Sequence, residues 1–418
     1  MRRVAVVGLL ALAVLPVALV AGAPGAGAAK STSACVADVA KVTGTVPDAA
    51  AASATLPKKL VAKLDAAAQA SFEVAAAPGA IVGVRTPKGT WINAYGEADP
   101  TTGAPMTTDM HMRIGSVTKT VTGTVILQLA EQGKLSLDDP IEKYVSGIPN
   151  GSDITLRMLA NMTSGIASYY TDPFLDRYFA NPQGAFTPSE LVAYGVTESP
   201  IFAPGKRFDY SNTNTVLLGQ VIEKVTGRPV ADVLAENITG PLQLTGTVWP
   251  EDSTVIPAPY ANGYTLQGGG DPANPTDATN WNPSFGWTAG AYISTVADML
   301  NYDEALATGH GLVSTATQKA RLKSFPKPAG YGFAIGCSDG WIGHTGELPG
   351  YNTTVYYDTT SATAVVVMVN SDIKSGNCPD SPTLTDTPRE LVCSSPATRV
   401  FVGVSKALGH EFQPNPAR

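Results

Sequence analysis

Strand-forming segments near both ends of the chain, separated by a long helical stretch, restrict the possible folds most strongly. Residues 79–98 are predicted to form a hairpin, because AIVGVRT and TWINAYGEA flank a Pro-Lys-Gly turn. Further β-rich runs lie near the C-terminus: YGFAIG, WIGHTG, YNTTVYYD and TAVVVMVN. Short turns join these runs, so the pattern favours an antiparallel sheet.

Helical patterns fill most of the remaining chain. Helices are expected at residues 58–72, 116–133, 213–227, within 288–308 and at 397–408. The middle, from about residue 138 to 280, combines helical patches with breaks at proline, glycine and asparagine. The simplest packing joins both strand regions in one sheet, with helices on its faces and a helical lobe beside it. The predicted class is therefore α+β, an α/β sandwich, with a site in the cleft between sheet and lobe.

The N-terminus has the features of a secretory signal peptide. Arg2 and Arg3 precede an apolar run over residues 4–20, and an Ala-Gly-Ala cleavage site follows at 26–28. We therefore expect residues 1–29 to be removed and the mature protein to be secreted, without a membrane span. Residues 30–57 are expected to form a flexible leader, followed by one domain over 58–410 and a tail over 411–418.

The cysteine content and the charge bound the chemistry further. Four cysteines in an exported chain indicate two disulfides, with three possible pairings. Cys378 and Cys393 bracket a Pro/Thr/Asp-rich loop, so a local bond is favoured there, which leaves Cys35 with Cys337. No CxxC or HExxH motif occurs, so we predict neither a metal site nor a cofactor. The net charge of −7 argues against nucleic-acid binding through phosphates.

The stretch RIGSVTKT, residues 113–120, carries the strongest candidate for catalysis. If Ser116 begins a helix, Lys119 lies one turn further on the same face, where its amine can reach the hydroxyl. The helix N-terminus offers unpaired N–H groups, and a lysine removed from water loses its proton more easily and can act as a base. The alternative is that Ser116 is only an N-cap, but a capping box has Glu or Gln, not Lys, at the third position.

Two other serines imitate parts of this pattern. A second Ser-x-x-Lys begins at Ser371, ends a strand and enters a Gly/Pro-rich loop, so it is expected to be solvent-exposed. Ser338, in GCSDG, matches the GxSxG nucleophile elbow. A strand rather than a helix follows Ser338, however, and the neighbouring Cys337 is expected to be oxidised. Ser116 is therefore preferred.

A tyrosine and an asparagine form the second motif, YSN at residues 210–212. The Tyr210 hydroxyl, placed near an ammonium, would ionise more easily and relay a proton. The Asn212 amide can hold Lys119 and a substrate carbonyl. In this chain Ser-x-x-Lys comes first and this polar element second, which is the order found in serine enzymes that use a Ser-x-x-Lys motif.

The third motif is HTG, formed by His344, Thr345 and Gly346 on a predicted strand. Gly346 leaves room for a substrate to lie along the strand edge. The main chain of such a strand can bond the substrate and donate an N–H to an oxyanion.

Together these motifs resemble those of the serine β-lactamase-like hydrolases: class C β-lactamases, secreted D-alanyl-D-alanine carboxypeptidases of the SVTK/YSN/HTG type, and related esterases. The resemblance runs from about residue 79 to 372 and includes KLSLDDPIEKY, ITLRMLANMTSGI, FAPGKRFDYSNTNTVLLGQVIEKVTG, GPLQLTGTVWP, TAGAYISTVADML and GHTGELPGYN. It implies a β-lactamase/transpeptidase-like fold and acylation of Ser116 by an amide or ester, followed by hydrolysis.

The resemblance also implies roles for individual residues. Lys119 and Tyr210 would carry protons, and Asn212 would position groups. His344 would take a place often held by lysine. The oxyanion hole would use the main-chain N–H groups of Ser116 and Glu347, and a further aromatic residue, Phe285, would line the cleft.

Glu347 departs from the family pattern, because a small or neutral residue usually follows HTG. Carboxypeptidases bind a terminal carboxylate through a cation, and GYGFAIGCSDGWIG before HTG contains no Arg or Lys. We expect an exported, monomeric serine hydrolase of the D-alanyl-D-alanine carboxypeptidase or β-lactamase type, acting on a small peptide, β-lactam or ester, with peptidoglycan precursors among the candidates. The alternatives are an esterase and a non-catalytic penicillin-binding-like protein.

Overall fold

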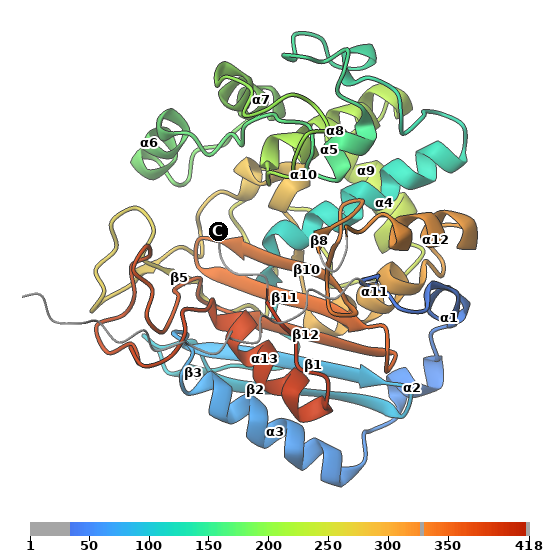
Figure 1. Ribbon diagram of the computed structural model, residues 1–418. Helices are drawn as coiled ribbons and strands as arrows, with labels where there is room; N and C mark the ends of the chain where they lie inside the picture. Colours follow the sequence, from blue (N-terminus) through green and yellow to red (C-terminus); the bar gives the residue numbers. More distant parts are fainter. Residues whose placement is uncertain (1–33, 327–329, 415–418) are drawn as a thin grey trace, which may run out of the picture. The chain divides into compact units, whose positions relative to one another are not determined.

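The computed structural model describes residues 34–326 and 330–414 (Figure 1). The predicted signal peptide, residues 1–29, lies outside the described residues. Within those two ranges, no helix has the length and apolar character needed to cross a membrane.

An antiparallel sheet of eight strands forms the centre of the fold, in the order β3-β2-β1-β12-β11-β10-β9-β8. The predicted hairpin is confirmed as its first two strands, and Ala80 pairs with Val369 where the N-terminal and C-terminal strands meet. YGFAIG was expected to be one strand but is divided between two short ones, with a positive φ of 53° at Ala334 between them. The strands are β1 (Gly79–Thr86), β2 (Gly89–Asp99), β3 (Ala104–Pro105), β8 (Gly330–Tyr331), β9 (Gly336–Ser338), β10 (Trp341–Leu348), β11 (Tyr351–Asp358) and β12 (Thr363–Val369).

Helices and minor strands make up the other regular structure. The α-helices are α1 (Val39–Gly44), α2 (Ala49–Ser53), α3 (Lys58–Phe72), α4 (Thr118–Glu131), α5 (Leu156–Ala160), α6 (Asp172–Ala180), α7 (Pro188–Thr197), α8 (Asn212–Thr226), α9 (Val230–Leu234), α10 (Trp287–Gly290), α11 (Val296–Thr308), α12 (Thr315–Lys323) and α13 (Pro396–Leu408). Short 3₁₀ helices form at η1 (Gly115–Val117), η2 (Ile141–Lys143) and η4 (Pro283–Phe285), and a π-helical turn forms at η3 (Ala235–Thr239). Two small ladders pair β4 (Met112–Arg113) with β7 (Ile293–Ser294), and β5 (Tyr264–Thr265) with β6 (Thr276–Asp277).

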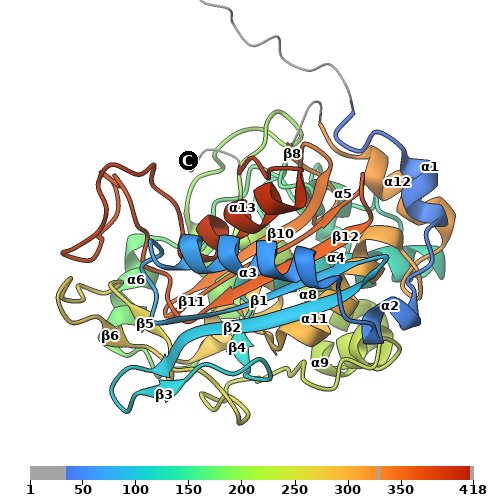
Figure 2. The same ribbon diagram turned by 90° about the horizontal axis from the view of Figure 1, so that it is seen from below.

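Helices cover both faces of the sheet. Successive side chains of a strand point to opposite faces, so the apolar residues of the central strands need cover on both. On one face α3 and α13 pack against each other and on the strands (Figure 2). Val365 and Val367 of β12 belong to this core, together with Phe401 of α13. Val366 and Met368 point to the opposite face, where α11 packs. Burial on both faces explains the continuous apolar run TAVVVMV.

The helical lobe predicted for residues 138–280 contains α5 to α9 and long loops. Its central helix, α8, packs on α5, α7 and α4, and so connects the lobe to the helix that follows Ser116. Gly227 ends α8 in a left-handed conformation with φ 67°. The lobe therefore places its residues next to the start of α4.

The leader and the tail were expected to be flexible, but their described parts, residues 34–57 and 411–414, are packed. In the leader, α1 and α2 form, and Cys35, Val42 and Leu56 are buried. The main chain of Leu56 also bonds to Thr90 of β2. In the tail, Phe412 is buried against aromatic rings of the α13 core. The low-complexity composition concealed these contacts, because their partners lie in other elements of the chain, as far away as Cys337 for Cys35.

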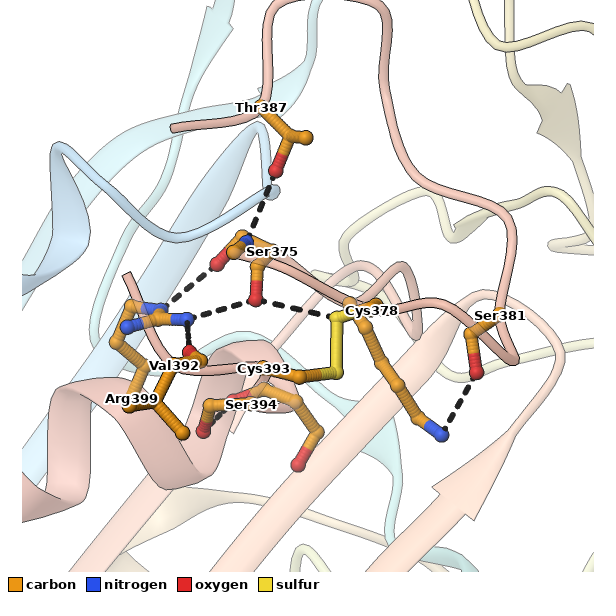
Figure 3. The surroundings of a disulfide bond; sticks show 11 residues. Ser375, Cys378, Ser381, Thr387, Val392, Cys393, Ser394 and Arg399 are labelled. Atoms are coloured by element: carbon orange, nitrogen blue, oxygen red, sulfur yellow. Dashed lines mark hydrogen bonds between the residues drawn. A yellow bond between two sulfur atoms is a disulfide. The ribbon is translucent and has the colours of Figure 1, made fainter. Parts of the chain in front are cut away.

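Both disulfides have the favoured pairing. Cys35 bonds to Cys337, across a separation of 302 residues, and Cys378 bonds to Cys393, across 15. The guanidinium of Arg399, on α13, donates to the main-chain oxygens of Ser375 and Val392 next to the shorter loop (Figure 3). The bond and the arginine together fix this loop to the helix.

Candidate active site

Ser116 lies in the 3₁₀ turn that leads into α4, and its side chain is partly exposed. Gly115 before it adopts φ 52°, a left-handed conformation that favours glycine. Lys119 follows in the first turn of α4, and its Nζ lies 2.8 Å from Ser116 Oγ. A second contact holds the amine, because Lys119 Nζ donates to the carbonyl oxygen of Ala289 at 2.7 Å. The predicted Ser–Lys pair is therefore in contact.

The environment of Lys119 favours the neutral amine. Its side chain has 0% of its surface exposed. Removal from water lowers the pKa of Lys119 well below its usual value. A neutral amine beside a serine hydroxyl can accept its proton, which is the role of a general base.

Tyr210 lies beside the same amine, just before α8. Lys119 Nζ lies 5.0 Å from the centroid of its ring. The structure corrects the expected ionisation: burial raises the pKa of Tyr210, and the nearby Ser116 hydroxyl opposes only part of the rise. Within the described residues its hydroxyl makes no hydrogen bond of standard geometry. Tyr210 therefore keeps its proton and can donate it.

Asn212 does not hold Lys119 in the way expected. No hydrogen bond joins these two side chains in the described part of the chain. The Lys119 amine donates instead to the carbonyl oxygen of Ala289. The Asn212 amide nitrogen lies 3.4 Å from Ser168 Oγ, on the lobe. Its predicted role toward the substrate carbonyl remains a prediction.

β10 brings the third motif against Ser116. A Cβ at Gly346 would lie 1.8 Å from the carbonyl oxygen of Ile114 and 3.2 Å from the main-chain nitrogen of Ser116. A Cβ at Gly115 would lie 2.5 Å from the nitrogen of Glu347. The two main-chain nitrogens expected to form the oxyanion hole therefore approach each other only because both positions are glycine.

Part of β10 is open to a substrate. Its pairing with β9 extends only from Trp341 to Gly343 within the described chain. Beyond Gly343, Thr345 is exposed, and the next turn of chain packed against the strand is η1 with Ser116. An extended substrate can add to this segment through main-chain hydrogen bonds.

His344 is neutral and fixed in one tautomer. Burial, and then the proximity of Lys119, lowers the pKa of His344 to about 3. Its Nδ1 donates to the carbonyl oxygen of Thr345, so Nε2 accepts from the Tyr331 hydroxyl at 3.0 Å. The Tyr331 ring also packs edge-on against Tyr210, with centroids 5.9 Å apart. Sequence reasoning missed Tyr331, whose only signal was its place in a β-rich run.

A pocket of about 80 Å³ adjoins β10 and contains Glu347. Phe285 lines it, as predicted, together with Tyr170, Phe174 and Tyr178 from the lobe. The lobe residues carried no motif and were missed. Placement in this cleft raises the pKa of the Glu347 carboxyl to about 7, and the charge of Asp372 adds to the rise. Because the Glu347 side chain is exposed, solvent screens this effect in part.

The other serines do not compete with Ser116. Ser338 lies on β9 and donates its hydroxyl to the carbonyl oxygen of Gln413, so it has no nucleophile elbow. Ser371 was expected to be solvent-exposed, but it is fully buried because Tyr264 of β5 bridges to it. Across residues 34–326 and 330–414, no group of three or more His, Cys, Asp or Glu side chains is arranged to hold a metal ion.

The antiparallel sheet, the helical lobe and the Ser–Lys pair between them correspond to the fold and the reactive pair of the β-lactamase and penicillin-binding protein superfamily. The chain matches the family described as Beta-lactamase over residues 58–382 and belongs to it.

Several of the similar proteins have names that refer to D-amino acid compounds, and one curated relative, from Bacillus subtilis, is named a putative penicillin-binding protein. The chain is 27% identical over 312 residues to a D-aminopeptidase of Brucella canis, covering 72% of this chain and 57% of that protein. It is 32% identical to a D-stereospecific amidohydrolase from Streptomyces sp., with a TM-score of 0.68 over 75% of this chain and 94% of that one. D-amino acid amidase from Ochrobactrum anthropi SV3, complexed with D-phenylalanine, is 25% identical with a TM-score of 0.69, over 83% and 99% of the two chains. The chain spans 28% to 61% of the length of the first curated relatives that it matches.

Proposed function

We propose that this serine hydrolase is exported and cleaves amide bonds of small substrates that contain D-amino acids, in the manner of a D-aminopeptidase or D-amino acid amidase. The observation that carries the proposal is the Ser116–Lys119 contact of 2.8 Å, made by a lysine with no exposed surface. The names of the relatives support the substrate class.

The geometry supports a two-step reaction. Lys119 takes the proton from Ser116 Oγ, which attacks the amide carbon, and the N–H groups of Ser116 and Glu347 stabilise the oxyanion. Tyr210 donates its proton to the leaving nitrogen and takes the proton that Lys119 holds. Water then attacks the acyl-enzyme and gives one proton to the Lys119–Tyr210 pair, which passes it to Ser116 Oγ as the bond from Oγ to the acyl carbon breaks. The product leaves as a carboxylic acid and loses its remaining proton to solvent.

A D-alanyl-D-alanine carboxypeptidase is the second candidate. It needs a cation for the terminal carboxylate, and Lys374, which follows β12, acts electrostatically on Glu347. Lys374 Nζ already donates to Ser381 Oγ at 3.0 Å, however, and Glu347 repels a carboxylate. These contacts favour an amidase over a carboxypeptidase. No specific contact favours an esterase.

The test is a panel of substrates with the mature protein and Ser116→Ala. D-Phenylalanine amide, D-alanine amide, an acylated D-Ala-D-Ala peptide and a phenyl acetate ester are compared by kcat/KM, and a phosphonate ester probe is followed by intact mass. We expect an adduct on Ser116, hydrolysis of the D-amides, and loss of both in the variant. Failure of the probe to label the wild-type protein, together with failure to hydrolyse every substrate, would overturn the proposal.

Export is supported by the signal-like N-terminus and the two disulfides. Expression of the full chain in a secreting bacterial host tests it: mature protein in the medium, with its N-terminus near residue 30, is expected. Retention of the uncleaved chain in the cytoplasm would contradict it. The expected monomer also remains a prediction, checked by sedimentation of the same material.

A further inference from the structure

Glu347 combines two features that the proposed reaction does not use. Its carboxyl lines the pocket beside β10, and the structure gives it no hydrogen bond or ion pair with any described residue. Its own main-chain N–H is placed to bind the oxyanion. One residue therefore presents a hydrogen-bond donor and an unpaired acid at the reacting carbonyl.

We propose that the Glu347 carboxylate binds the free α-ammonium group of the residue whose carbonyl is attacked, while the adjacent pocket takes the aromatic or large apolar side chain of that residue. This inference rests on the proposed function and names its substrate: amides of N-terminally unblocked residues with large apolar side chains.

Glu347 lies close to the place that the α-carbon of the substrate takes in the proposed reaction. The α-carbon of the acyl group is one bond from the carbonyl carbon, so its substituents lie close to the oxyanion hole. Because Glu347 contributes to that hole through its N–H, its side chain begins within a few bonds of the same place. An ammonium on the α-carbon is then within reach of the carboxylate, and a charge-assisted hydrogen bond forms.

The surrounding charges favour a cation. Asp372 adds a second acid near Glu347 and is held by Thr265 and Gln267. Among the described residues, the cation that acts on Glu347 is Lys374, whose amine donates to the Ser381 hydroxyl. An acylated substrate would bring no charge to offset Glu347, and a substrate carboxylate would be repelled.

Aromatic rings make up much of the pocket wall. The Tyr170 and Phe174 rings stack with centroids 5.3 Å apart, and Phe285 packs on Tyr178 at 4.5 Å. Tyr170 is 45% exposed and forms the accessible side of this wall. These rings give the pocket a mainly apolar wall, which suits an aromatic or other apolar side chain that packs on Tyr170 and Phe285.

The test compares D-phenylalanine p-nitroanilide, its N-acetyl derivative and D-alanine p-nitroanilide. The enzymes are the wild type, Glu347→Gln, Tyr170→Ala and Glu198→Gln. Glu198 is an exposed acid in a different surface pocket and serves as the charge-matched control. The phosphonate probe measures the nucleophile separately in each variant.

The wild type is expected to prefer the free amine over the N-acetyl compound, and Glu347→Gln to lower that preference about ten- to hundredfold. Tyr170→Ala should reduce the preference for phenylalanine over alanine, and Glu198→Gln should change neither ratio. An unchanged amine preference in Glu347→Gln would overturn the ammonium site, while the proposed hydrolase would stand if the amides are still cleaved. If the wild type takes the probe but cleaves none of the three anilides, the ammonium site is rejected; if it does not take the probe either, the proposed function fails as well.

Discussion

Lys119 Nζ lies 2.8 Å from Ser116 Oγ, and no part of Lys119 reaches solvent. Replacement by methionine keeps the length and the buried contacts of the side chain but removes the base. We expect Lys119→Met to lower kcat/KM for a D-amide by about 10²- to 10⁴-fold. The rate of Ser116 labelling by the phosphonate should fall in parallel, whereas the melting temperature should not fall, because a buried amine is costly. Labelling at the wild-type rate would rule out Lys119 as the activating base.

The oxyanion hole depends on the close approach of Gly346 to the main chain of Ile114 and Ser116. A Cβ there would lie 1.8 Å from the Ile114 carbonyl oxygen, so Gly346→Ala must push β10 away from η1. The loss of a positioned oxyanion donor costs about 10²- to 10³-fold in kcat. The control is Gly44→Ala on α1, where an added Cβ meets nothing within 4 Å. Steady-state kinetics on both variants, with circular dichroism to confirm folding, checks the expectation; full activity in Gly346→Ala would contradict this geometry.

The protonation of Glu347 should appear in the pH dependence of specificity. Its pKa is raised to about 7, first by desolvation and then by Asp372, while Lys374 opposes the rise. Below that pH the carboxyl is neutral and attracts an ammonium weakly. The preference for D-phenylalanine p-nitroanilide over its N-acetyl derivative should therefore increase between about pH 6 and 8. Glu347→Gln retains the titration of the substrate amine and serves as the reference; identical profiles for the two enzymes would contradict the assignment.

Local patterns predicted much of the scaffold. The helix Lys58–Phe72 has the predicted bounds, because its alanine-rich run contains no breaker. The i, i+3 spacing placed Lys119 beside Ser116, since that relationship lies within one helical turn. The motif order also selected Tyr210 and His344, which pack with ring centroids 6.1 Å apart.

Long-range contacts supplied what the sequence did not reveal. Ala289 holds Lys119 through a main-chain carbonyl, and any residue has such an oxygen. Tyr331 reaches His344 from a short outer strand, and Tyr170 enters the pocket from the lobe. The pKa of Tyr210 was expected to be lowered, but burial raises it, and burial depends on contacts that the sequence does not reveal.

The two disulfides should differ in their contribution to stability. Closing a longer loop removes more entropy from the unfolded chain, so the Cys35–Cys337 bond, with its separation of 302, should stabilise more than the Cys378–Cys393 bond, with 15. The expected difference in the free energy of unfolding is about 2–3 kcal/mol. Guanidinium titration of the paired variants Cys35→Ser/Cys337→Ser and Cys378→Ser/Cys393→Ser measures it. Equal losses would show that native contacts, such as those of Arg399, dominate instead.

Asp303, on α11, is an unused buried acid with a consequence for stability. It has 0% exposure, and neither carboxyl oxygen has a hydrogen-bond partner in the described chain. Desolvation, with the charge of Glu304, raises the pKa of Asp303 well above its usual value. The folded protein therefore holds a proton that the unfolded chain releases above about pH 4. Since the folded state binds more protons, stability from this group is full at low pH and falls as the pH rises toward the folded pKa.

Asp303→Asn should remove that pH dependence. The variant should gain stability over the wild type with increasing pH, by up to about 1.4 kcal/mol per pH unit above pH 4, until the folded pKa is reached. Asp139→Asn is the control of opposite sign, because bonds from Tyr144 and the Ser136 main chain lower the pKa of Asp139 to about 2. That variant should lose stability at neutral pH and converge on the wild type in acid. Urea unfolding from about pH 2 to 9 distinguishes the two, and a constant difference between Asp303→Asn and the wild type above about pH 4 would show that Asp303 is ionised in the folded protein.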